Sequence, residues 1–104
     1  MPRGKSGKPI SCRRDGNHDQ VARWYEQTGC SVVDLSQVGG GCSDLLIGCA
    51  GVTDLSEVKM PGEELRPDQK TFNTKWRGSR PWKVSKLDDV LEHVADLRRR
   101  ARRL

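Results

Sequence analysis

Several features that define large classes of protein are missing from this sequence. It has no apolar run near the roughly 20 residues of a membrane-spanning helix, and its opening segment MPRGKSGKPIS lacks the apolar core of a secretion signal. We therefore expect a soluble, cytoplasmic protein. The four cysteines include no Cys-x-x-Cys pair, and only two histidines accompany them. This scarcity favours free thiols over a structural zinc site or a disulfide scaffold.

The hydrophobic content is also low. Only 34% of the 104 residues are hydrophobic, whereas 32% are charged, which predicts one domain with a small core. We expect a flexible basic arm over residues 1–14, a domain over 15–97 and an arginine-rich tail over 98–104. The arm and the tail each carry five positive charges of a net +5, which leaves −5 for the domain between them. Basic ends of this kind suit a polyanionic partner such as nucleic acid, although they are also compatible with a role in solubility alone.

Two strand-like segments meet at Ala50-Gly51 and predict a β-hairpin. A turn centred there pairs residues whose numbers sum to 101, so Asp44 faces Glu57. Directly opposed Cβ atoms lie roughly 4.5–5.5 Å apart. Because side chains alternate between faces, Lys59 lies on the same face as Glu57. The register therefore brings two carboxylates and an ammonium together.

Two adjacent carboxylates repel each other unless a proton or a cation lies between them. Carboxylate oxygens are suitable ligands for Mg²⁺ or Mn²⁺, which commonly act on phosphate groups. The hairpin therefore predicts a divalent-metal site for phosphodiester hydrolysis. The alternative is a solvated hairpin with ordinary surface charges.

The rest of the chain predicts a small α/β domain with a mixed sheet, in the order α-β-β-β-α-β-α. The expected elements are helices over about 17–28 and 66–77, a last helix after Ser85, and further strands over 30–35 and 81–85. The last helix has one apolar face formed by Leu87, Val90, Leu91, Val94 and Leu97. His93 lies off this face, and we expect it to be exposed to solvent.

Two further features lie close to the predicted metal site. Gln69 falls in an apolar stripe with Phe72 and Trp76, where a polar side chain needs partners. It is either a satisfied core amide or a group that reaches back to the metal site. The run Gly39-Gly40-Gly41 permits positive φ and a close approach to phosphate, or forms a plain turn.

These residues, in this order, resemble the PD-(D/E)XK nuclease superfamily. Within it, residues 15–91 resemble the virus-type replication-repair nucleases (VRR-NUC), which are similar to Holliday junction resolvases and often phage-encoded. The resemblance rests on Asp44, on Glu57-Val58-Lys59, and on the segments Leu65-x-Pro67-Asp68-Gln69 and Trp76-Arg77-Gly78.

The resemblance implies an αβββαβ(α) restriction-endonuclease-like core and metal-dependent hydrolysis of DNA, selective for junctions or flaps in replication, recombination or repair. Asp44, Glu57 and the Val58 carbonyl would hold Mg²⁺ or Mn²⁺, and no small-molecule cofactor would be needed. Lys59 would orient the attacking water or stabilise the developing charge, and Gln69 would position the lysine or the water.

Two positions depart from the family pattern. Ser43 replaces a proline that is not a ligand. Gln20 stands where the first helix usually supplies a glutamate, and an amide brings neither charge nor a general base. The alternative is therefore a catalytically weakened DNA-binding module of the same fold. A structural or partner-binding protein with basic tails is a third possibility.

The expected DNA contacts are basic residues that would bind the phosphate backbone. They are Arg13, Arg14, Lys75, Arg77, Arg80 and the arginine tail, of which Arg77 and Arg80 flank Gly78 in an expected loop. Stand-alone members of the family resemble dimeric resolvases, and so short a chain offers little surface to grip a junction. We therefore expect a homodimer.

Overall fold

The computed structural model describes residues 16–104. Along the chain these residues form α1 (His18–Gln27), β1 (Ser31–Asp34), β2 (Leu45–Cys49), β3 (Val52–Val58), α2 (Pro67–Lys75), β4 (Trp82–Val84) and α3 (Leu87–Ala101). The predicted α/β class and element order are confirmed, and the predicted bounds differ from these by a few residues. The expected basic arm, with Arg13 and Arg14, lies outside the described residues.

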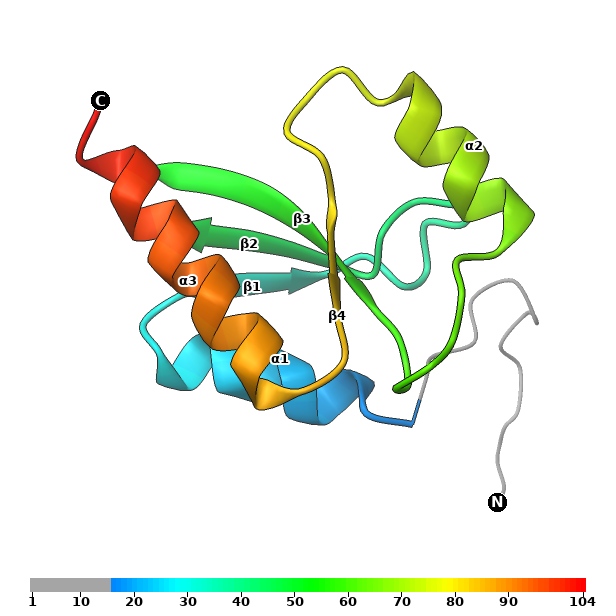
Figure 1. Ribbon diagram of the computed structural model, residues 1–104, viewed down its shortest axis with the longest axis horizontal. Coiled ribbons are helices and arrows are strands. Elements are labelled where there is room, and N and C mark those ends of the chain that lie inside the picture. Colours follow the sequence, from blue (N-terminus) through cyan, green and yellow to red (C-terminus); the bar gives the residue numbers. More distant parts are fainter. Residues whose placement is uncertain (1–15) are drawn as a thin grey trace.

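The four strands form one mixed sheet in the order β1-β2-β3-β4. Strands β1, β2 and β3 are antiparallel neighbours, and β4 runs parallel to β3, with Glu57 paired to Lys83. In Figure 1, α1 and α3 lie together beside the sheet, whereas α2 lies apart from them, next to the long loop that precedes β2. After β3 the chain forms α2 and then returns as β4, which pairs with β3 at the edge of the sheet.

The β2–β3 hairpin has the predicted register. Leu46 pairs with Leu55 and Cys49 with Val52, and both pairs sum to 101. Ala50 and Gly51 have φ values of 54° and 85°, so both central turn residues are left-handed, as a tight hairpin that follows the strand twist requires. Asp44 directly precedes β2 and is therefore placed opposite Glu57.

Adjacent residues of β3 point to opposite sides of the sheet. The Ser56 hydroxyl contacts Tyr25 of α1, whereas Glu57 contacts Gln69 of α2. The core lies on the side of α1 and α3, where it contains Val21, Tyr25, Leu45, Ile47, Val58, Val84, Val90, Val94 and Leu97. The opposite side carries the predicted metal-site residues.

The prediction of which α3 residues face the core is partly wrong. His93 is fully buried, whereas Leu87 and Leu91 are 41% and 46% exposed. The helix is rotated so that Val90, His93, Val94 and Leu97 face the sheet. Burial of His93 is tolerated because both of its ring nitrogens have hydrogen-bond partners inside the protein.

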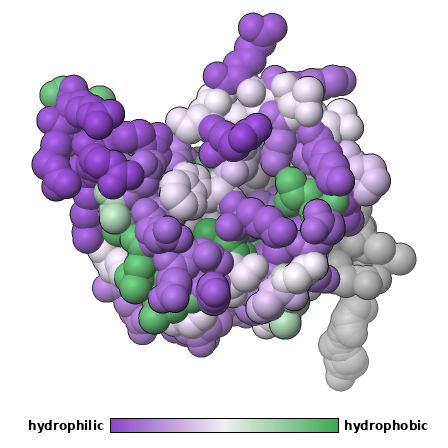
Figure 2. All heavy atoms as spheres, viewed as in Figure 1, coloured by the Kyte–Doolittle hydropathy of each residue, from purple (hydrophilic) through white to green (hydrophobic). Residues whose placement is uncertain are grey.

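Within residues 16–104, none of the helices combines the length and the apolar composition needed to cross a bilayer. The face shown in Figure 2 is largely hydrophilic, most strongly around the C-terminal end of α3. Most hydrophobic side chains on this face occur singly or in small groups between polar ones.

Candidate active site on the α2 side of the sheet

The structure brings Asp44, Glu57 and Lys59 together on one side of the sheet. Glu57 and Lys59 are only 3% and 4% exposed. Burial, a hydrogen bond with Asp44 and the charge of Asp44 together raise the pKa of Glu57 to about 9, against the smaller opposing effects of Lys59 and Arg66. The two carboxyl groups are therefore in contact, and the raised pKa keeps Glu57 protonated near neutral pH.

Two main-chain amides fix the position of Asp44. Its Oδ2 accepts a hydrogen bond of 2.8 Å from the Val58 amide, and its carbonyl oxygen accepts one of 2.7 Å from the Leu35 amide. The donor to the carboxylate belongs to β3, and the donor to the carbonyl oxygen is the residue that directly follows β1, so Asp44 is held between two strands of the sheet. The carboxylate can therefore face Glu57 without relying on a flexible loop.

Gln69 is the buried residue that joins α2 to this cluster. Its Nε2 donates a 2.6 Å hydrogen bond to Glu57 Oε2, and its Oε1 accepts one of 2.8 Å from the Arg66 amide. Both ends of the amide are thus satisfied, and one of the partners is the proposed metal ligand. Gln69 therefore reaches the predicted site, where its hydrogen bond is with Glu57.

One glycine of the predicted loop has a specific packing role. A Cβ on Gly41 would lie 2.2 Å from the Asp68 carbonyl oxygen, and its φ is +79°. Only a residue without a side chain lets this loop touch the first turn of α2. Gly39 and Gly40 meet nothing within 4 Å, so the close approach depends on Gly41.

Cys42 and Asn17 are residues near the site that the sequence did not single out. Burial raises the pKa of the Cys42 thiol, and the charges of Glu57 and Asp44 raise it further, which places Cys42 beside the carboxylates. Asn17 Nδ2 donates to the carbonyl oxygens of Lys59 and Ser85, at 3.1 and 2.9 Å. It thereby fixes the main chain at Lys59.

Gln20 lies apart from this arrangement. It is exposed on α1, and within residues 16–104 no hydrogen bond joins it to Asp44, Glu57 or Lys59. The buried polar residue of that helix turn is His18, whose Nε2 lies 3.4 Å from Asp34 Oδ2. Nothing in the sequence around His18 indicated this contact.

The expected DNA-contacting residues within 16–104 differ in their availability to a partner. Lys75, Arg77 and Arg80 are exposed at the end of α2 and in the following loop. Arg98, Arg99 and Arg100 belong to α3, and each contacts this protein: Arg98 binds the Thr28 carbonyl, Arg99 binds Asp96, and Arg100 binds Asp54 and Asp96. Lys75, Arg77 and Arg80 are therefore more available for a polyanion than these three arginines, and so are the exposed Arg102 and Arg103 after α3.

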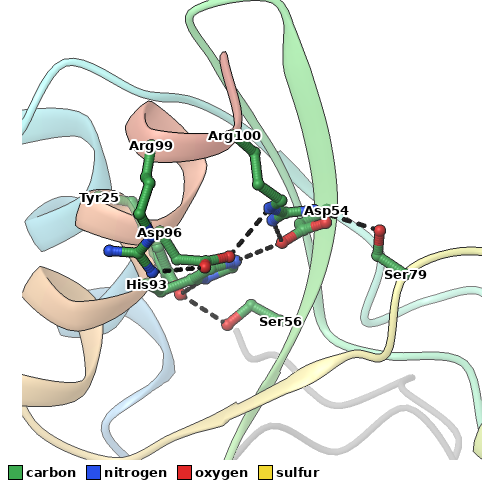
Figure 3. Close-up of polar contacts among 8 residues, drawn as sticks. All are labelled: Tyr25, Asp54, Ser56, Ser79, His93, Asp96, Arg99 and Arg100. Carbon is green, nitrogen blue, oxygen red and sulfur yellow. Dashed lines mark hydrogen bonds and ion pairs between the residues drawn. The ribbon is translucent and has the colours of Figure 1, made fainter. Parts of the chain in front are cut away.

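A second polar cluster lies on the other side of the sheet, between β3 and α3 (Figure 3). His93 Nε2 lies 2.7 Å from Asp54 Oδ2, and His93 Nδ1 lies 2.7 Å from the Tyr25 hydroxyl. Tyr25 also contacts Ser56, and Arg100 contacts Asp54.

Burial alone would raise the pKa of Asp54, but hydrogen bonds from His93 and Arg100 outweigh it and lower the pKa. Asp54 and His93 are 3% and 0% exposed. This cluster is therefore closed to a large substrate and serves to join α1, β3 and α3.

Comparison with known family models, curated proteins and solved structures finds no match. Within residues 16–104, no three or more His, Cys, Asp and Glu side chains come together as a metal-binding group. A cation at Asp44 and Glu57 would thus have two carboxylates, with its other ligands drawn from main-chain oxygen, water or substrate.

Proposed function

We propose that the protein is a divalent-metal-dependent nuclease that hydrolyses phosphodiester bonds in DNA. The observation that carries this proposal is the contact between Asp44 and Glu57 beside the buried Lys59. Two carboxylates and a lysine on one sheet are a suitable set of groups for metal-assisted attack on phosphate. The resemblance to the PD-(D/E)XK nucleases supports the same assignment of residues.

The residues fit a cation of the Mg²⁺ type. Burial and the neighbouring Asp44 together raise the pKa of Glu57, because both disfavour its charged form, and a cation offsets both effects as a proton does. Mg²⁺ is commonly held by one or two carboxylates, with water and phosphate oxygens completing its shell. Asp44, Glu57 and the Val58 carbonyl would hold the ion, which lowers the pKa of bound water and neutralises charge on the phosphate.

The protein's own groups then orient the reaction. The Val58 amide holds Oδ2 of Asp44, and the Gln69 amide holds Oε2 of Glu57, so each carboxylate has one fixed oxygen. The Lys59 ammonium is close enough to Glu57 to affect its pKa. It would place a fixed positive charge beside the phosphate, where it orients the attacking water and stabilises the transition state.

A cleavage assay tests this proposal. Four-way junctions, flaps and linear duplex would be incubated with Mg²⁺, Mn²⁺ or a chelator. We expect metal-dependent cleavage, with a preference for junctions or flaps, and about a 100-fold loss or more in Lys59→Ala, Glu57→Gln and Asp44→Asn. Glu92→Gln, an exposed change on α3, is the matched control. Full cleavage by Glu57→Gln would contradict the proposal.

One alternative is a DNA-binding module with weakened catalysis, because Gln20 stands where the resemblance to the nuclease family leads us to expect a glutamate. That alternative predicts DNA binding without cleavage under any metal, and recovery of cleavage in Gln20→Glu. Cleavage by the unaltered protein would reject it. The expected homodimer is not needed for either function and stays a prediction.

A further inference from the structure

An open cavity of about 480 Å³ lies between α2 and the glycine loop that precedes β2. We call it the aromatic cavity, and it is lined by Gly40, Asp68, Thr71, Phe72, Lys75 and Trp76. Its volume lies in the range of about 300–1,000 Å³ that is typical of small-ligand sites. None of its lining residues belongs to the Asp44–Glu57–Lys59 cluster, so it needs an explanation of its own.

Two stacked aromatic rings form one wall of the cavity. The centroids of Phe72 and Trp76 lie 5.5 Å apart, with 16° between the ring planes. Trp76 is nevertheless 44% exposed. A Cβ on Gly78 would lie 2.7 Å from the Trp76 Nε1, so the chain after the helix lies against the indole and holds its orientation. The cavity therefore presents a flat, ordered and accessible aromatic surface.

The charged groups of the cavity indicate which kind of flat ligand it suits. Lys75 lies in the same wall, and the exposed Arg77 and Arg80 follow it along the chain. The Asp68 carboxylate, which also contacts Arg66 at 3.3 Å, and the Thr71 hydroxyl can accept hydrogen bonds from ring amino groups. Stacking surface, acceptors and nearby cations together suit a nucleobase attached to a phosphate backbone.

The position of the cavity relates it to the proposed active site. Gln69, which binds Glu57, lies three residues before Phe72 on the helix, a rise of about 4.5 Å. The contact between Gly41 and Asp68 fixes the opposite wall. A strand whose phosphate reaches Glu57 would thus have a neighbouring base close to the aromatic cavity. A paired base stays stacked inside the duplex, and only an unpaired or extruded base can enter.

We propose that the aromatic cavity binds one unpaired base of a DNA strand, next to the phosphate that is cleaved. The location relative to cleavage rests on the proposed nuclease function, whereas base binding itself does not require catalysis. The protein then selects strands that carry an unpaired nucleotide at the cleavage position, because a fully paired strand offers no base to the stacked pair.

A fluorescence titration tests the proposal with the full chain. The probe is a duplex with a short single-stranded flap that carries 2-aminopurine, in Ca²⁺, and a fully paired duplex serves as comparison. We expect quenching of the flap probe, with about tenfold weaker affinity or more in Trp76→Ala and near-normal quenching in Trp76→Phe. Gly78→Ala displaces the indole and should weaken binding while retaining both rings.

Leu91→Ala is the matched control, because Leu91 is 46% exposed on another helix. Unchanged affinity of Trp76→Ala for the flap would overturn the proposal. Free dAMP that competes as well as the flap, at equal nucleotide concentration, would also overturn it, because the cavity would then take a mononucleotide rather than a strand.

The two proposals fail in distinguishable ways. Quenching that depends on Trp76 in a protein without cleavage under any metal would reject the nuclease and leave the base-binding site. Metal-dependent cleavage that ignores both Trp76→Ala and the pairing state of the substrate would reject the base-binding site and leave the nuclease.

Discussion

The side-chain amide of Gln69 lies 2.6 Å from Oε2 of Glu57, although the two residues belong to α2 and β3. This hydrogen bond links α2 directly to the carboxylate pair. Gly41 adds a second contact by touching the first turn of α2. The helix is therefore attached where the proposed chemistry occurs, and its far end carries Trp76.

Glu57→Gln should stabilise the metal-free protein at alkaline pH. Folding raises the pKa of Glu57 from 4.5 to about 9, so the stability that the proton provides is complete below 4.5 and is lost as pH rises toward 9. Glutamine has no such loss. Near pH 8 we expect the variant to be more stable by about 1 kcal/mol or more, a rise in Tm of roughly 4–8 °C. Thermal unfolding in chelator at several pH values measures this, and parallel pH profiles for both proteins would contradict it.

Gly41→Ala should be far more damaging than Gly39→Ala. Both glycines have positive φ, so both changes introduce backbone strain of about 1–2 kcal/mol. A Cβ at Gly41 also meets the Asp68 carbonyl, whereas one at Gly39 meets nothing within 4 Å. We expect Gly41→Ala to lose about 2 kcal/mol more in free energy of unfolding, measured in urea. Equal losses would show that the loop does not need this approach to α2.

Asp54→Asn should destabilise the fold without altering the proposed site. It removes the buried charge that contacts both His93 and Arg100, at a cost of about 3 kcal/mol. Asp96→Asn, the control, removes a partly exposed partner of Arg99 and Arg100 and should cost about 1 kcal/mol or less.

Because the pKa of Asp54 is lowered from 3.8, the difference between the wild type and Asp54→Asn should vanish as pH falls below that value. Urea unfolding of the three proteins over a range of acidic pH measures this. Equal costs for the two substitutions would contradict a central role for Asp54.

Lys75→Ala should weaken DNA binding in a salt-dependent manner. Each lysine that neutralises a phosphate contributes about one to the slope of log affinity against log salt concentration. Lys75 lines the aromatic cavity, whereas Lys86 is exposed at the start of α3 and provides the control Lys86→Ala. Binding isotherms at several salt concentrations should give a smaller slope for Lys75→Ala alone. Identical slopes for both variants would place the DNA elsewhere.

The parts of the structure that sequence predicted best are those set by local rules. The hairpin register followed from a turn centred at Ala50-Gly51. In the structure both residues are left-handed, as a two-residue hairpin turn requires. The inward position of Gln69 followed from its spacing in the helix. Together these two features located the carboxylate pair and one of its partners.

The missed parts depend on contacts between distant segments. Helical spacing predicted that Leu91 faces inward and His93 faces solvent. The structure buries His93 instead, because Tyr25 and Asp54 satisfy its ring nitrogens. The aromatic cavity likewise depends on the approach of Gly41 to Asp68. No local pattern in the sequence carries that information.

Calorimetric titration with Mn²⁺ tests the central claim most directly, because the claim is that a cation replaces the proton that Glu57 holds beside Asp44. Near pH 7, titrations in buffers of different ionisation enthalpy should show release of about one proton per bound ion. Glu57→Gln should bind weakly and release none, and Glu92→Gln should behave as the wild type. Tight binding by Glu57→Gln, or wild-type binding without proton release, would contradict the account.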